Sequence, residues 1–103
     1  MKIVKATEFT GKTAWDALDL FRLNGVTARV HWTDTPYIWH ENDGPEVFAV
    51  LDGSIAMHIR TNNEERVLML GVGDVFVAEE GDQHRAVPEG VARILVVEKA
   101  GSV

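Results

Sequence analysis

The residues of this chain that are best suited to chemistry are four histidines and the carboxylates spaced around two of them. A single histidine is more often a surface or packed residue than a ligand, and this holds for His31 and His58. The other two stand in patterned blocks, which read His40-x-Asn42-x3-Glu46-x6-Gly53 and Gly73-x5-Glu79-x-Gly81-x2-His84. Imidazole and carboxylate groups brought together can ligate a metal ion or transfer a proton.

The first block has the spacing of a strand followed by a turn. Residues two apart on a strand point to the same side, so His40 and Asn42 are expected to project together. The turn signal at 43–45 then returns the chain, and Glu46 begins the next strand facing the same interior. His84 follows a tight glycine turn and is expected to enter that interior from elsewhere.

Short segments between turn signals predict an all-β chain. The turn signals recur from Asn24-Gly25 to Pro88-Glu89-Gly90. The segments between them are rich in β-branched and aromatic residues and cover 26–32, 37–40, 46–51, 55–60, 66–70, 75–78 and 91–98. Residues 13–23 fit a helix or a strand, and we favour a turn or short helix at 13–16 followed by a strand. Seven or eight short strands in so small a chain predict a closed or sandwiched sheet.

Two of these segments carry clear information about their surroundings. In 26–32, Ala28 and Val30 are expected on a core face and Arg29 and His31 on a wetter face. The run 94–97 is apolar on both sides, which predicts a strand in the interior of a sheet or at a subunit interface.

Composition excludes several classes of protein. The 103 residues and 11.4 kDa allow one domain with one modest core. Ten Lys and Arg are scattered against 16 Asp and Glu, for a net charge of −6, so nucleic acid is not an expected partner. Apolar runs are too short to cross a membrane, and no signal-peptide core is seen, so the cytoplasm is expected. The absence of cysteine excludes disulfides, thiolate zinc sites and iron–sulfur clusters.

The two patterned blocks resemble the two motifs of the cupin superfamily, in particular the small single-domain cupin 2 proteins. Those motifs are G-x5-H-x-H-x3,4-E-x6-G and G-x5-P-x-G-x2-H-x3-N. The chain keeps six of their positions in the right order, namely His40, Glu46, Gly53, Gly73, Gly81 and His84. The resemblance implies a small double-stranded β-helix, or jelly-roll, barrel. It implies one cupin domain over 1–103, with a strand and turn extension at 1–25 and the barrel at 26–101.

The chain also departs from both motifs. Asp34, Asn42, Glu79 and Pro88 stand where the motifs have glycine, histidine, proline and asparagine. The changes at Asp34 and Glu79 concern turn geometry, whereas the change at Asn42 removes a metal ligand of the family.

The resemblance implies a divalent metal ion, Fe, Mn, Ni or Zn, held by His40, Glu46 and His84. Two imidazoles and one carboxylate are the set that holds non-haem Fe(II) with open positions for substrate and oxygen. Asn42 either adds an amide oxygen to this set or only hydrogen-bonds. A Glu46 carboxylate inside an apolar barrel would cost several kcal/mol unless it is compensated. In the alternative interpretation, Glu46 pairs with an arginine or a protonated histidine, and the site is a metal-free relic.

Other polar residues receive simpler interpretations. Arg85 is expected on the face opposite to His84, as a surface or interface residue, and His31 and His58 at a polar pocket rim or in solvent. Tyr37 and Trp39 flank His40 and are candidates for the pocket mouth, although aromatic residues at strand positions are mostly packing residues. Glu79 lies near the barrel mouth by the resemblance and is a candidate base. No residue of 26–103 is identified as a clamp for a substrate.

Three classes of function remain open from the sequence. The first is an enzyme that acts on a small organic molecule bound at the metal, by oxygenase, isomerase or lyase chemistry. The second is a small-ligand-binding or sensing barrel without turnover, with or without metal, and the third is a structural domain. Whether the chain is an enzyme is left open, and no catalytic residue is identified. The resemblance further implies a homodimer.

Overall fold

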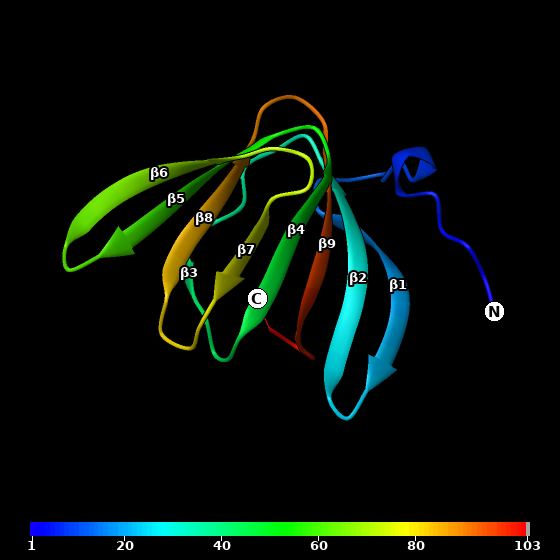
Figure 1. Ribbon diagram of the computed structural model, residues 1–103, viewed down its shortest axis with the longest axis horizontal. Coiled ribbons are helices and arrows are strands. Elements are labelled where there is room, and N and C mark those ends of the chain that lie inside the picture. The colour runs from blue at the N-terminus through cyan, green and yellow to red at the C-terminus, as the bar shows by residue number, and fades with distance from the viewer. Residues whose placement is uncertain (103) are drawn as a thin grey trace.

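The chain folds into two antiparallel β-sheets, and the computed structural model describes residues 1–102 (Figure 1). One sheet has the strand order β1-β2-β9-β4-β7 and the other β3-β8-β5-β6. A short 3-10 helix, η1 (Ala6–Glu8), precedes the strands. The strands are β1 (Asp16–Leu23), β2 (Val26–Thr33), β3 (His40–Glu41), β4 (Glu46–Asp52), β5 (Ile55–Thr61), β6 (Glu64–Leu70), β7 (Val75–Ala78), β8 (Gln83–Pro88) and β9 (Ala92–Lys99). The predicted all-β class is confirmed.

The predicted strands differ from the structure at two places. The segment 37–40 contributes only its last residue to β3, and β8 is a strand that the sequence pattern did not indicate. The pattern did not indicate β8 because this strand begins with Gln83-His84-Arg85, which contains no run of apolar residues. These polar residues still alternate, since His84 is buried while Gln83 and Arg85 are more exposed. The turn expected at 13–16, with a strand after it, is confirmed.

Two tight hairpins extend from opposite sides of the molecule (Figure 1). The β1–β2 turn has φ of 50° at Asn24 and 77° at Gly25, and the β5–β6 turn has 51° at Asn62 and 64° at Asn63. Two successive positive φ angles are the mark of the turn type whose twist matches that of the flanking strands. Asparagine and glycine tolerate this conformation, so the sequence fixes both hairpins locally.

The core lies between the two sheets, on the inward faces of β4, β5, β8 and β9. Its buried cluster consists of Phe48, Val50, Ile55, Met57, Ala86, Ala92, Ile94 and Val96. β9 runs between β2 and β4, which confirms the prediction that 94–97 belongs to the interior of a sheet. Its inward residues are buried and its outward residues half-buried.

The alternation predicted for β2 is confirmed and its apolar residues are buried, but the prediction that their face is the one turned to the core between the sheets is wrong. Ala28 and Val30 are buried, each 2% exposed. Arg29 and His31 are the register partners of Val96 and Ile94, two members of the core cluster, so the polar face of β2 is the inward one. The barrel interior therefore contains polar side chains from this strand.

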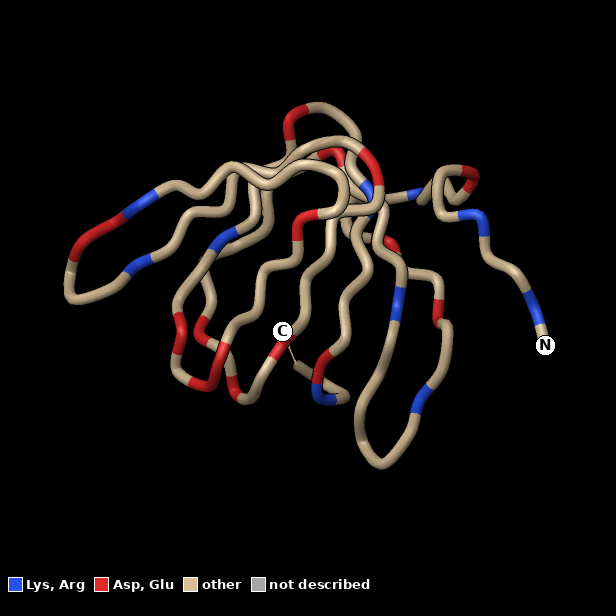
Figure 2. Tube along the Cα trace, viewed as in Figure 1, with Lys and Arg blue, Asp and Glu red and all other residues tan. Residues whose placement is uncertain are grey.

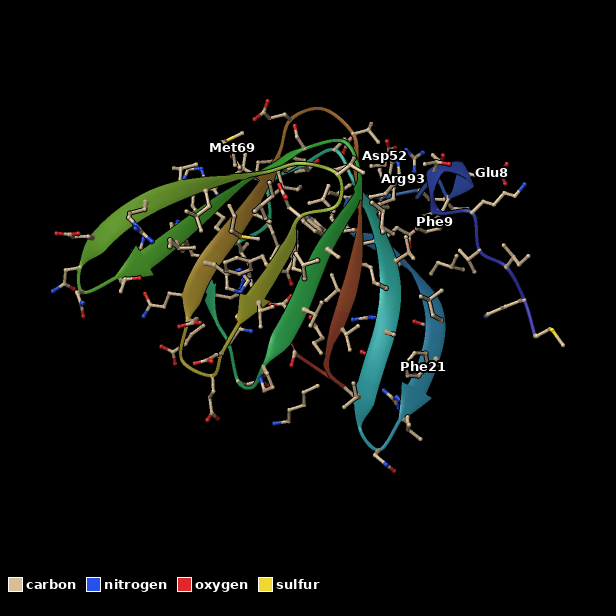
Figure 3. All side chains as sticks on the ribbon, in the orientation of Figure 1. Glu8, Phe9, Phe21, Asp52, Met69 and Arg93 are labelled. Atoms are coloured by element: carbon tan, nitrogen blue, oxygen red, sulfur yellow. The ribbon has the colours of Figure 1, made fainter. Side chains whose placement is uncertain are left out.

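The segment before β1 is held against the barrel by Arg93, which Figure 3 shows beside Asp52 and Phe9. Arg93 Nη1 donates to Asp52 Oδ2 at 2.6 Å, and Arg93 Nε donates to the carbonyl oxygen of Phe9 at 2.8 Å. One side chain thus joins β9, the end of β4 and the N-terminal segment.

Charged residues are spread over the chain without a gathering of Lys and Arg (Figure 2). Several acidic residues lie in the turns at the lower end of this view, where β3 leads into β4 and β7 into β8. No helix within residues 1–102 is long and apolar enough to cross a membrane.

The turn after β4 gives a test of the fold. Gly53 has φ of 78°, and a Cβ added there would collide with the carbonyl oxygen of Val91. We expect Gly53→Ala to lower the free energy of unfolding by about 2–4 kcal/mol, from backbone strain and the collision together. Gly90→Ala is the matched control, because Gly90 has φ of 74° but open space around it, and strain alone should cost about 1–2 kcal/mol. Equal losses in urea unfolding of the two variants would contradict the close approach.

Candidate metal centre

His40 and His84 face each other across the short β3–β8 pair. They are register partners, and their ring centroids lie 4.2 Å apart. The His84 side chain is 2% exposed, whereas His40 is half-buried. The two histidines that the sequence singled out are therefore brought together by strand pairing.

Glu46 reaches the same point from the other sheet. It begins β4, is 8% exposed, and places Oε1 3.2 Å from Nε2 of His84. Ligand atoms of His40, Glu46 and His84 all lie within 4.8 Å of one another. The cluster thus spans the interior between the sheets.

Asn42 lies between Glu46 and His84 and contacts both. Its Nδ2 donates to Glu46 Oε1 and to the Gly44 carbonyl oxygen, each at 3.2 Å, and its Oδ1 lies 2.5 Å from His84 Nε2. The backbone holds it in place, since its N–H donates to Asp82 O and its carbonyl accepts from the N–H of Gly81. The turn before β8 therefore fixes Asn42, which directly follows β3.

The geometry of this cluster fits a divalent metal ion. Two ligand atoms bound about 2.1 Å from one ion at tetrahedral or octahedral angles lie about 3.0–3.4 Å apart. The 3.2 Å between His84 Nε2 and Glu46 Oε1 is such a separation. His40 Nδ1 lies 3.2 Å from the carbonyl oxygen of Ile38, and donation there leaves Nε2 free as a ligand. His84 Nδ1, in contrast, is buried without a hydrogen-bond partner among residues 1–102.

The charge states of two of these residues also suit metal ligation. Burial lowers the pKa of His40, although its contact with the Ile38 carbonyl opposes this shift, so the imidazole is neutral near pH 7. Burial alone would raise the pKa of Glu46, but its hydrogen bond with His84, the charge of that residue and the Asn42 amide together lower it. Glu46 is therefore an ionised carboxylate.

A second carboxylate, which the sequence analysis missed, lies beside Glu46. Glu98 of β9 is its register partner across the β4–β9 pair. Burial, together with the charge of Glu46, raises the pKa of Glu98 to about 7. The inward alternation of β9, continued two residues beyond Val96, was the signal that could have found it.

The cluster opens onto a cavity of about 250 Å³ that is itself open to solvent. Its lining is Trp15, Arg29, His31, Tyr37, His40, Glu46, Phe48, His84, Ala86, Val96, Glu98 and Ser102. His31 therefore lies at a polar pocket, as one of its predicted placements had it, and Tyr37 lines the cavity as well as packing. Trp15, Arg29 and Ser102 were missed, because segments distant in sequence contribute them.

Comparison of the folds finds known proteins that comparison of the whole sequences does not. Neither the protein-family models nor the curated proteins include a match to the sequence. Among solved structures, a cupin-2 domain containing protein from Shewanella frigidimarina superposes with a TM-score of 0.76 at 21% identity, over 90% of this chain and 86% of that one. A cupin superfamily protein from Desulfitobacterium hafniense gives 0.77 at 13% identity, over 92% and 86%.

The chain has the cupin fold. A third similar structure is hydroxypropylphosphonic acid epoxidase from S. wedmorenis, with a TM-score of 0.70 and 20% identity over 80% of this chain and 49% of that one. The jelly-roll barrel that the motif resemblance implied is thus confirmed, and three of the positions that match the motifs, His40, Glu46 and His84, cluster in space.

The remaining polar residues of the sequence analysis lie outside the cavity lining of this cupin fold. Arg85 Nε donates to the Tyr37 carbonyl oxygen at 3.0 Å, and Glu79 is exposed. His58 pairs with Glu65 at 3.2 Å on the β5–β6 hairpin. Glu79 consequently does not border the cavity where a base would be needed.

The raised pKa of Glu98 predicts a pH dependence of stability in metal-free protein. Between about pH 4.5 and 7 the folded state binds more protons than the unfolded state, so stability falls as pH rises through this window. Glu98→Gln should remove this loss. The full shift would be about 3 kcal/mol at 1.36 kcal/mol per pKa unit, and solvent screening of this partly exposed group reduces our expectation to about 1 kcal/mol. The measurement is urea unfolding of both proteins in EDTA at pH 5 and pH 8, and parallel pH dependences would contradict it.

Proposed function

We propose that this chain binds a divalent transition metal ion through His40, Glu46 and His84 and acts on a small organic molecule in the adjoining cavity. The observation that carries the proposal is the convergence of the three side chains at the wall of a cavity. The Asn42 amide oxygen lies at hydrogen-bond distance from His84 Nε2, and it would separate from that nitrogen to join the ligands. Fe, Mn, Ni and Zn are the ions that such a nitrogen and oxygen donor set suits.

The chain's own residues would prepare the site for chemistry. Glu46 supplies the negative charge, and Asn42 holds one of its oxygens in a fixed orientation. Phe48, Ala86 and Val96 give the cavity an apolar wall that limits water near the centre. When bound, a divalent ion polarises a substrate oxygen and, as Fe(II), offers open positions for dioxygen. Oxygenase, isomerase and lyase reactions all fit this arrangement, and the fold of the neighbouring epoxidase supports an enzyme.

A second candidate is a barrel that binds a small ligand without turnover and without metal. Asn42 favours it, because its amide already links Glu46 to His84 by hydrogen bonds. In that case the buried carboxylate is compensated by Asn42 and His84 rather than by an ion.

Metal content separates the two candidates. We expect untagged protein, purified without chelator or added metal, to carry close to one metal ion per chain by mass spectrometry. His84→Ala should lose nearly all of it, because one of three strong ligands is gone. His58→Ala is the matched control, since it removes an imidazole that lies outside the cavity, and it should keep the wild-type content.

The same preparations test for an enzyme. Metal-dependent oxygen consumption, or product formation from a panel of small organic molecules, that is lost in His84→Ala would support catalysis. Thermal stabilisation by a ligand without any product would favour the binding module. Wild-type protein that stays far below one metal ion per chain after reconstitution would refute the metal centre.

We also propose a homodimer formed through the outward face of the first sheet. Val75 and Val77 of β7 are 56% and 62% exposed there. Val77 also lines a groove of about 480 Å³, whose lining includes Val47, Val97, Glu80 and Lys99. In a two-fold contact, Glu80 of one copy can meet Lys99 of the other, so a second copy of this chain suits the groove. The single-domain organisation and the cytoplasmic location expected from the sequence stay predictions.

The dimer predicts an effect of one charge on this face. Val77→Glu should convert the dimer to a monomer in size-exclusion chromatography with light scattering, because it would bury a carboxylate in an apolar contact. Val67→Glu is the matched control, since Val67 is 50% exposed but lies on β6 of the other sheet. A wild-type monomer at high protein concentration, or a dimer unaffected by Val77→Glu, would contradict this interface.

A further inference from the structure

Arg29 brings a positive charge to the interior face of β2. Its register partner across the β2–β9 pair is Val96, which belongs to the buried core cluster. Arg29 lines the same cavity as His40, Glu46 and His84. Its charge acts on other lining residues, since it lowers the pKa of His31 and opposes the rise in the pKa of Tyr37, both shifts being caused mainly by burial.

Within residues 1–102, Arg29 differs from the other half-buried arginines in having no hydrogen-bond or ion-pair partner for its side chain. Arg93 pairs with Asp52 at 2.6 Å, and Arg85 Nε donates to the Tyr37 carbonyl oxygen. Within residues 1–102, Arg29 has no ion pair within 4.0 Å and no side-chain hydrogen bond. The charge of Arg29 acts on the Glu98 carboxylate in the same cavity and opposes the rise in its pKa, but the two side chains form no ion pair within 4.0 Å. A bound anion would give the half-buried guanidinium a direct partner.

The surroundings of Arg29 limit the size of such an anion. The cavity of about 250 Å³ has room for about eight water molecules at 30 Å³ each. Arg29 stands on β2, two strands away from β4, so its Cα lies about 10 Å from that of Phe48 at the usual strand spacing. Val96 stands between the two positions in the sheet, and Ala86 of the other sheet also lines the cavity. A short organic molecule with polar ends can span it.

The net charge of the chain makes a local cation decisive. At −6, the protein exerts no general attraction on anions. An anion would therefore be selected by a group inside the cavity. Among residues 1–102, Arg29 is the one arginine or lysine that lines the cavity. The planar guanidinium donates two parallel hydrogen bonds to two oxygens of a carboxylate or a phosphonate.

We propose that Arg29 is the clamp for a small organic anion, whose oxyanion head it binds while the rest of the molecule extends toward His40, Glu46 and His84. This deepens the proposed function, and the contact at the far end rests on it. The clamp itself requires no metal ion. The substrate class is thus a short carboxylate or phosphonate with a further oxygen for the metal centre.

Calorimetric titration of the full chain tests the clamp. Oxalate, malonate, succinate and glutarate are the carboxylate probes, methylphosphonate is the phosphonate probe, and neutral succinamide is the control ligand. Each is titrated into Zn²⁺-loaded and EDTA-treated protein, and zinc content is measured separately. We expect at least one anion, but not succinamide, to bind with a Kd of about 1 mM or tighter.

Arg29→Gln should weaken that binding by about tenfold to a hundredfold and leave the zinc content unchanged. Arg29→Lys keeps the charge but loses the two parallel hydrogen bonds, so its anion affinity should lie between those of wild type and Arg29→Gln. It replaces Arg29→Gln in the test if that variant does not fold. Arg60→Gln is the matched control, because Arg60 is exposed over the Trp39 ring and outside the cavity.

Each outcome bears on a separate claim. Equal anion affinity in wild type and both Arg29 variants would overturn the clamp, as would a lack of anion binding by wild type in both forms. Arg29-dependent binding by EDTA-treated protein that takes up no zinc would support the clamp and refute zinc as the ion of the metal centre. The probe that binds best identifies the head group and the distance between the two ends.

Discussion

A buried carboxylate on β4 is the constraint around which this barrel is organised. Glu46 is 8% exposed, and an uncompensated charge at that depth would destabilise the fold by several kcal/mol. Its compensation comes from the other sheet, through His84 at 3.2 Å and the Asn42 amide. The two sheets are therefore joined by a polar contact as well as by the apolar cluster between them.

Asn42 gives this centre its particular character. Where the cupin motif has a second histidine, an amide bridges Glu46 and His84 and can stabilise the pair without an ion. The same amide leaves its oxygen directed at the place where a metal would bind. Because of this amide, metal affinity is the property that decides between an enzyme and a binding barrel.

The inward face of β2 supplies part of the polar lining of the cavity. Its polar residues give the interior a cation at Arg29 and an imidazole at His31, so charged and polar side chains line the cavity together with apolar ones. With the Glu46 and Glu98 carboxylates side by side, the interior contains charges of both signs. Such a cavity is suited to a ligand that carries charge, rather than to a wholly apolar one.

The sequence by itself determined the all-β class, most strand positions, both asparagine-containing hairpin turns and the three residues of the candidate metal centre. These follow from local rules, because alternation, turn chemistry and motif spacing are readable within a few residues. Only the tertiary structure decided that Arg29 faces inward and that Glu98 lies beside Glu46. It also decided that Trp15 and Ser102 complete the cavity. The physical reason is that a strand's alternation specifies two faces without saying which is the interior, and that pairing between distant strands, β4 with β9 and β2 with β9, makes the choice.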